Sequence, residues 1–151
     1  MAPFDEIFAA VNGARADIGL LIHEGQLTYA QEGFSLIVDL GQWWHHVTDG
    51  LPLPLGGNVI HKRFTPEERR QLNDILKESI QYSLDHRAPA VTHSLAYGRG
   101  LDTALADKFV GMYVNELTLD YGQRGREGIT RFLGAAHELG ILPEPVAPEF
   151  V

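Results

Sequence analysis

The sequence has 151 residues, with a hydrophobic content of 44% and a charged content of 21%, values typical of one globular domain rather than a disordered chain. Its formal net charge is −8, which argues against nucleic acid as a partner because phosphate binding needs a basic face. There is no cysteine, so disulfides, thiolate zinc sites and cysteine nucleophiles are excluded.

The first residues carry acidic side chains and lack a basic segment followed by an apolar core, so no signal peptide is predicted. No apolar run approaches the roughly 18 residues that a membrane-spanning helix needs. The sequence therefore predicts a cytoplasmic protein with no membrane partner.

The sequence from 3 to 16 predicts an amphipathic helix that stops at Gly13, because apolar side chains recur at helical spacing at Phe4, Ile7, Phe8 and Val11. Short apolar runs then predict buried strands at 17–22 and 34–40. A helical turn is expected at 41–50. Two prolines make 51–57 an extended crossing segment, followed by a third strand at 58–61.

From Thr65 onwards the pattern is helical. Thr65 is a typical N-cap, Pro66 suits the first helical position, and Glu68 is placed for a capping box. An apolar face then continues to about residue 86 through Leu72, Ile75, Leu76, Ile80 and Leu84. Further helices are predicted at 89–97, 102–115 and 123–139, the last ending at Gly140.

These elements predict an α/β segment over 1–64, with cleft-lining strand ends and a lobe crossover, and a helical segment over 65–151. Three strands make a thin sheet, and parallel sheets usually have more strands and helices on both faces. The two segments are therefore expected to form one incomplete domain unit.

The stretch LLIHEGQLTY, residues 20–29, places His23 and Glu24 where a strand is predicted to end. Histidine exchanges protons near neutral pH, and α/β folds open their ligand crevices beyond strand ends. Neighbours in a strand point to opposite faces, so His23 and Glu24 would act together only if the chain turns there. The structural alternative is a histidine that simply hydrogen-bonds at a strand terminus.

A second cluster comprises Trp43, Trp44, His45 and His46. Adjacent residues on a helix diverge by about 100°, so the two histidines would not bind one metal ion. There is no HExxH motif and no carboxylate at ligand spacing, so no metal site is predicted. The tryptophans are expected in the core or a cleft wall.

In PLPLGGNVI, Gly56 and Gly57 permit close approach of the backbone to a ligand, although neither a Walker loop nor GxGxxG is matched. A bend between lobes is the favoured interpretation. The polar residues that follow residue 97 are explained by helix capping and surface pairing, and no catalytic role is assigned to them. They are Arg99, Asp102, Asp107, Lys108, Asn115, Glu116 and Asp120.

Five stretches together resemble one known family: IHEGQLTY, VDLGQWW, GLPLPLGGN, ADKFVGMYVNELTLDYGQRGREGI and the closing PEFV. The chain resembles the 1,4-dihydroxy-6-naphthoate synthases of menaquinone biosynthesis, in the futalosine route, from Pro3 to Val151. The resemblance implies an α/β fold of the type II periplasmic-binding-protein kind, with two lobes around a ligand cleft. This chain would form part of that fold, with a helical C-terminal half.

The resemblance also implies a lyase that splits cyclic dehypoxanthinylfutalosine to release 1,4-dihydroxy-6-naphthoate, with no metal or organic cofactor. The family's proton acceptor is the histidine of its IHE motif, which matches His23. This base would abstract a proton adjacent to a carbonyl and so start an elimination. Trp43, Trp44, Gly56 and Gly57 would lie near the cleft or the lobe crossover, as candidates for substrate binding.

Members of the family are nearly twice as long, and this chain resembles their C-terminal portion. It is therefore expected to be a truncated chain, one piece of a split enzyme, or a chain that pairs with a second copy. The expected partners are a small-molecule substrate and either a missing N-terminal half or the chain itself. Two alternatives stay open: a receptor-like lobe that binds a small ligand without catalysis, and a helical interaction domain with an exposed apolar helix face.

Overall fold

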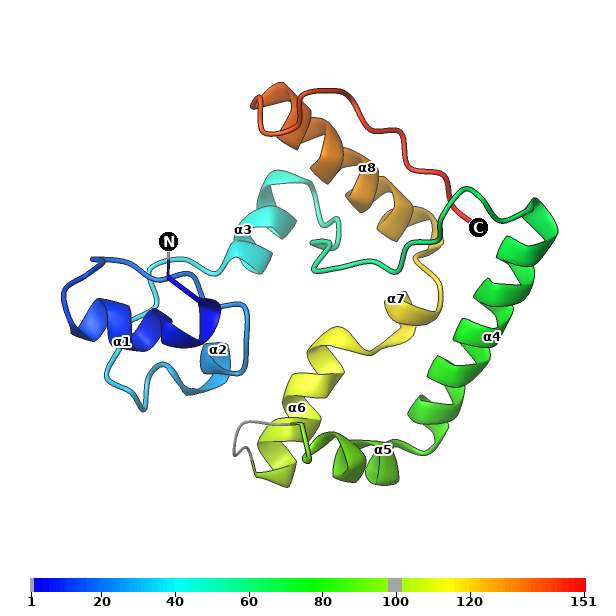
Figure 1. The fold of residues 1–151 in the computed structure, drawn as a ribbon. Coiled ribbons are helices and arrows are strands. Elements are labelled where there is room, and N and C mark those ends of the chain that lie inside the picture. Colours follow the sequence, from blue (N-terminus) through cyan, green and yellow to red (C-terminus); the bar gives the residue numbers. More distant parts are fainter. Residues whose placement is uncertain (1, 98–101) are drawn as a thin grey trace. The chain divides into compact units, whose positions relative to one another are not determined.

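The computed structural model describes residues 2–97 and 102–151, and the chain divides into two compact units, Met1–Ile37 (unit 1) and Val38–Val151 (unit 2). Within the described residues the regular secondary structure is helical and contains no strand (Figure 1). The predicted α/β class, with a periplasmic-binding-protein-like sheet in two lobes, is therefore wrong. The division of one incomplete domain into the segments 1–64 and 65–151 stays a prediction.

The three predicted strands fail for a common reason. Residues 17–22 and 58–61 follow an irregular course, and 34–40 does so until α3 begins at Leu40. A strand exists only when its backbone N–H and C=O groups pair with a neighbouring strand. An apolar run predicts that a segment buries its side chains, but it does not supply a neighbouring strand for the backbone to pair with. The described residues contain no such strand.

Unit 1 contains a 3₁₀ turn, η1 (Phe4–Glu6), and two short helices, α1 (Ile7–Asn12) and α2 (Gly25–Thr28). The predicted first helix is confirmed, and Gly13 is its C-cap, with its N–H donating to the carbonyl of Ala9. Helix α2 was not predicted. The segment before it packs closely on α1, because a Cβ at Gly19 would collide with the side chain of Ile7.

Unit 2 begins with α3 (Leu40–Val47), whose N-cap is Asp39. The Asp39 carboxylate accepts a hydrogen bond of 2.9 Å from the N–H of Gln42. The predicted helical turn at 41–50 is thus confirmed, and Gly50 turns the chain with a φ of 88°. Trp44 and Leu51 are buried here, at 5% and 6% exposed.

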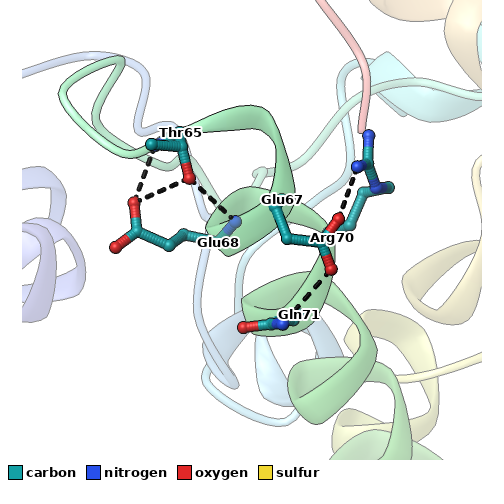
Figure 2. Close-up of polar contacts among 5 residues, drawn as sticks. All are labelled: Thr65, Glu67, Glu68, Arg70 and Gln71. Atoms are coloured by element: carbon teal, nitrogen blue, oxygen red, sulfur yellow. Dashed lines mark hydrogen bonds and ion pairs between the residues drawn. The ribbon is translucent and has the colours of Figure 1, made fainter.

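Helix α4 (Pro66–Asp85) starts as predicted, with a complete capping box (Figure 2). The Thr65 hydroxyl accepts from the N–H of Glu68 at 3.2 Å, and the Glu68 carboxylate accepts from the N–H of Thr65 at 2.8 Å. These two bonds satisfy donors that a helix start otherwise leaves unpaired. In the same first turn, Glu67 pairs with Arg70 and accepts a hydrogen bond from Gln71.

The apolar face of α4 has little cover. No residue of this helix is buried, and its exposed apolar side chains include Leu72, Ile75 and Leu76, at 42%, 63% and 40%. Within unit 2, α4 contacts α5 and α7. An amphipathic helix of this length normally buries its apolar stripe, so the face is available to a partner.

The remaining helices are α5 (Arg87–Ser94), α6 (Thr103–Tyr113), α7 (Glu116–Leu119) and α8 (Gly122–Glu138). The predictions for 102–115 and 123–139 are confirmed, whereas α5 begins earlier and ends at Ser94. Arg87 joins α5 to α6: its Nε donates to the Asp107 carboxylate and its Nη2 to the Asp107 carbonyl, both at 2.7 Å. In the described part of the chain, no helix is both long and apolar enough to cross a membrane.

Candidate active site

His23 lies in unit 1, in the turn that leads into α2. Its Nδ1 accepts a hydrogen bond of 2.9 Å from the backbone N–H of Gly25. Its Nε2 is buried and has no hydrogen-bond partner among the described residues. The side chain is only 12% exposed. An imidazole with one nitrogen engaged and the other buried without a partner is unusual, because an unpaired buried polar atom costs about 1–3 kcal/mol.

Aromatic rings enclose the imidazole. The ring of Phe4 lies 5.8 Å from the ring of His23 between centroids, and the ring of Phe8 lies 6.1 Å away, edge-on. Phe8 in turn stacks on Phe34 at 4.9 Å. Phe4 of η1 and Phe8 of α1, two of the apolar side chains that predicted the first helix, therefore form the wall against which His23 packs.

Gly25 makes this arrangement possible. A Cβ at this position would lie 2.5 Å from Cε1 of His23 and 2.9 Å from Cζ of Phe8, distances that real contacts do not reach. Any other residue would push the imidazole away from the Gly25 N–H. The sequence offered one signal for this residue, a glycine two positions after the histidine, but its role depends on the turn.

Glu24 places a charged group close to the imidazole. Its Oε2 lies 3.9 Å from Nδ1 of His23, and its side chain is 21% exposed. The chain does turn here, because the carbonyl of His23 accepts from the N–H of Gln26 and that of Glu24 from the N–H of Leu27. The condition under which His23 and Glu24 could act together is therefore met.

The two tryptophans have different positions on α3. Trp43 is 52% exposed, whereas Trp44 is buried, contacts the ring of Phe132 edge-on at 5.7 Å, and donates its indole N–H to the carbonyl of Pro52 at 3.1 Å. Trp44 is thus a core residue that fixes the segment after α3. The role of both tryptophans in substrate binding stays a prediction.

Gly56 and Gly57 line a cavity of about 360 Å³ in unit 2, between the extended segment 52–58 and the region of α6 to α8. Asn58 and Tyr121 contribute polar groups to its wall, and Met112 and Ile129 contribute apolar ones. Pockets for small organic ligands combine such surfaces. Gly128 of α8 gives this segment room, because a Cβ there would lie 2.7 Å from the carbonyl oxygen of Pro52.

The polar residues after Tyr97 act mainly at helix ends. Asp102 caps α6, Asn115 caps α7, and the Asp120 carboxylate accepts from the N–H of Gly122. That hydrogen bond, with help from nearby cations, holds the pKa of Asp120 below its usual value. Arg99 lies outside the described residues. Within the described ranges, no three histidine or carboxylate side chains gather closely enough to hold a metal ion.

Comparison with known proteins places the chain in a family. Residues 1–138 match the family model described as menaquinone biosynthesis, so the chain belongs to the menaquinone-biosynthesis family. It is 34% identical over 141 residues to a 1,4-dihydroxy-6-naphthoate synthase of Streptomyces coelicolor, covering 93% of this chain and 50% of that protein. It is 32% identical over 148 residues to the synthase of Thermus thermophilus, covering 98% and 54%.

A crystal structure of a protein from Archaeoglobus fulgidus has the same fold over this region. The TM-score is 0.87 at 35% sequence identity, and the match covers 93% of this chain and 53% of that one. The chain spans about half the length of the curated relatives that it matches. The resemblance seen in the sequence motifs is therefore confirmed.

Proposed function

We propose that this chain is the C-terminal part of a lyase that converts cyclic dehypoxanthinylfutalosine to 1,4-dihydroxy-6-naphthoate, with His23 as the proton acceptor. The proposal rests on family membership together with the enclosed imidazole of His23. In the proposed step, His23 takes a proton from a carbon next to a carbonyl. The electron pair of that C–H bond forms a C=C bond, and the leaving group departs with the pair of its own bond.

The cavity beside Gly56 and Gly57 is the proposed contact site in unit 2 for part of the substrate. Its apolar wall suits an aromatic ring, and the amide of Asn58 and the hydroxyl of Tyr121 can donate to carbonyl or hydroxyl oxygens. We assign no metal or organic cofactor to the reaction. The expected cytoplasmic location stays a prediction.

We further propose that activity needs a second polypeptide portion, equivalent to the half of the relatives that this chain does not span. The support is apolar surface in unit 1, where Ile18, Leu20, Leu36 and Ile37 are 58–70% exposed and Ala10 is the one buried hydrophobic side chain described. Exposed apolar surface of this kind marks an interface. The alternative is that a second copy of this chain covers the same surface.

The test is to combine the chain with a polypeptide that covers the other half of the Thermus thermophilus synthase and to measure naphthoate release. We expect turnover in the mixture. H23Q should reduce kcat by about 10²–10⁴-fold, the usual contribution of a general base. H46Q is the matched control, because His46 is exposed on α3, and it should leave turnover unchanged.

Wild-type turnover in the H23Q mixture would contradict the role of His23. The second candidate function, a small-ligand receptor, is favoured by the cavity alone. It predicts that 1,4-dihydroxy-6-naphthoate binds equally to wild-type chain and H23Q, with no substrate turnover by either in the mixture. Calorimetric titration with 1,4-dihydroxy-6-naphthoate, alongside the activity assay, separates the two functions.

A further inference from the structure

The hydrogen bond between Gly25 and His23 fixes where the imidazole carries its hydrogen. A backbone N–H only donates, so Nδ1 of His23 must present its lone pair to Gly25. The neutral ring therefore carries its hydrogen on Nε2. That N–H is buried beside Phe4 and Phe8 and finds no acceptor among the described residues.

In this conformation His23 cannot act as a base at either nitrogen. The lone pair of Nδ1 is occupied by the Gly25 N–H, and Nε2 already has its hydrogen. This inference rests on the proposed function, in which His23 abstracts a proton. Proton abstraction requires the other tautomer. In that form Nδ1 carries the hydrogen and the lone pair of Nε2 is free.

Glu24 is placed to stabilise that other tautomer. Its Oε2 lies 3.9 Å from Nδ1, too far for a hydrogen bond but within range of a small side-chain rotation. An ionised carboxylate only accepts, so it can bond to Nδ1 only when Nδ1 carries a hydrogen. Both side chains are largely shielded, at 12% and 21% exposed, so solvent weakens their interaction less than it would at the surface.

We propose that Glu24 is a positioning residue that selects the base-competent tautomer of His23. The ring releases the Gly25 N–H and moves away from Phe4 and Phe8, so that water reaches it. Nε2 then gives its hydrogen to water, while Nδ1 takes one from water, keeps it, and donates a hydrogen bond to the Glu24 carboxylate. The net charge of the ring does not change. When His23 then takes the substrate proton at Nε2, the resulting imidazolium is paired with Glu24. Carboxylates fix histidine tautomers in this way in many sites.

The test is nitrogen NMR of the full chain with ¹⁵N-labelled histidine, because the two tautomers differ in which ring nitrogen carries the hydrogen. H23Q assigns the signal by its loss. We expect wild type to be mainly in the Nε2–H form with a minor Nδ1–H population. E24Q should lower that population on the order of tenfold, whereas E24D, which keeps a carboxylate, should retain part of it. E32Q, an exposed glutamate of the same unit, is the matched control.

An Nδ1–H population that is the same in wild type and E24Q, or equally lowered in E32Q, overturns the proposal. In the two-part activity assay, E24Q should lower kcat about tenfold with little change in KM, a part of the roughly 10²–10⁴-fold due to a general base. If H23Q is inactive but E24Q keeps its kcat, only the role of Glu24 fails. If H23Q keeps its turnover, the proposed function itself fails.

Discussion

The indole N–H of Trp44 donates to the carbonyl oxygen of Pro52 over 3.1 Å, and this bond ties α3 to the segment that lines the cavity of unit 2. The same carbonyl faces Gly128 of α8, where a Cβ would lie 2.7 Å away. Pro52 is therefore held between two helices. The position of Gly56 and Gly57 along the cavity wall depends on this anchor.

Replacing Trp44 by phenylalanine should destabilise unit 2. The change leaves the Pro52 carbonyl without its donor and removes part of the buried ring that contacts Phe132. We expect a loss of about 1–3 kcal/mol in the free energy of unfolding, measured by urea denaturation. W43F is the control: Trp43 is 52% exposed, and its replacement should change stability by less than about 0.5 kcal/mol.

Two glycine-to-alanine substitutions should have opposite effects. G25A introduces a Cβ into the ring of His23 and into Phe8, and we expect a loss of about 1–3 kcal/mol in stability. G134A adds a Cβ within α8 where nothing beyond its chain neighbours and the helix's own backbone lies within 4 Å, and it should stabilise the helix by about 0.5–1 kcal/mol. Thermal unfolding of both variants checks the pair. If G134A lowered the unfolding temperature as much as G25A, the expectation of open space beside Gly134 would be wrong.

The start of α4 should weaken in acid. Hydrogen bonds from the Thr65 N–H, and then from its hydroxyl, hold the pKa of Glu68 below its usual value. Because the folded pKa lies below the unfolded one, this stabilisation is complete above the unfolded value of about 4.3 and is lost as the pH falls through the folded pKa.

Comparison of wild type with E68Q tests this expectation. The wild type should have the higher unfolding midpoint at pH 7, and the difference should vanish once the pH falls below the folded pKa of Glu68 and the carboxylate is protonated. Circular dichroism of the helical signal during heating gives the midpoints. E78Q, on an exposed position of the same helix, should match wild type at pH 7. A difference between wild type and E68Q that persists in acid would contradict a charge-dependent cap.

The apolar face of α4 should cause self-association in the absence of a partner. Ile75 is 63% exposed at the middle of this face, so I75Q should lower the average mass measured by light scattering at high concentration. V59Q is the matched control, because Val59 is 96% exposed but lies outside the helix. A wild-type chain that stays monomeric at high concentration would contradict the prediction.

Helix α4 was predictable because its start depends on residues three positions apart. Thr65 and Glu68 satisfy each other's backbone N–H groups, and Pro66 needs no partner at the first helical position, whatever the rest of the chain does. The strands expected at 17–22 and 34–40 needed distant ladder partners, which an apolar pattern cannot specify. A local signal was also missed there: Asp39 is an N-cap, and it starts α3 at Leu40, where the apolar run predicted that a strand would end.

For the candidate site, the sequence singled out His23 because a histidine beside a glutamate is conspicuous where an apolar run ends. It did not indicate Phe4, Phe8 or Phe34 as neighbours of the imidazole, since these contacts depend on how α1 packs against the following turn. Nor did it indicate Gly25, whose lack of a side chain matters only once the ring lies above it. Residue type could be predicted, whereas proximity required the structure.

The ring contacts and the Gly25 hydrogen bond described here around His23 come from residues 4–34, a short span of sequence. Contacts between residues close in sequence form fast, because little loop-closure entropy opposes them. The enclosure of His23 is thus a matter of local folding, and it can form during synthesis before α8 has left the ribosome.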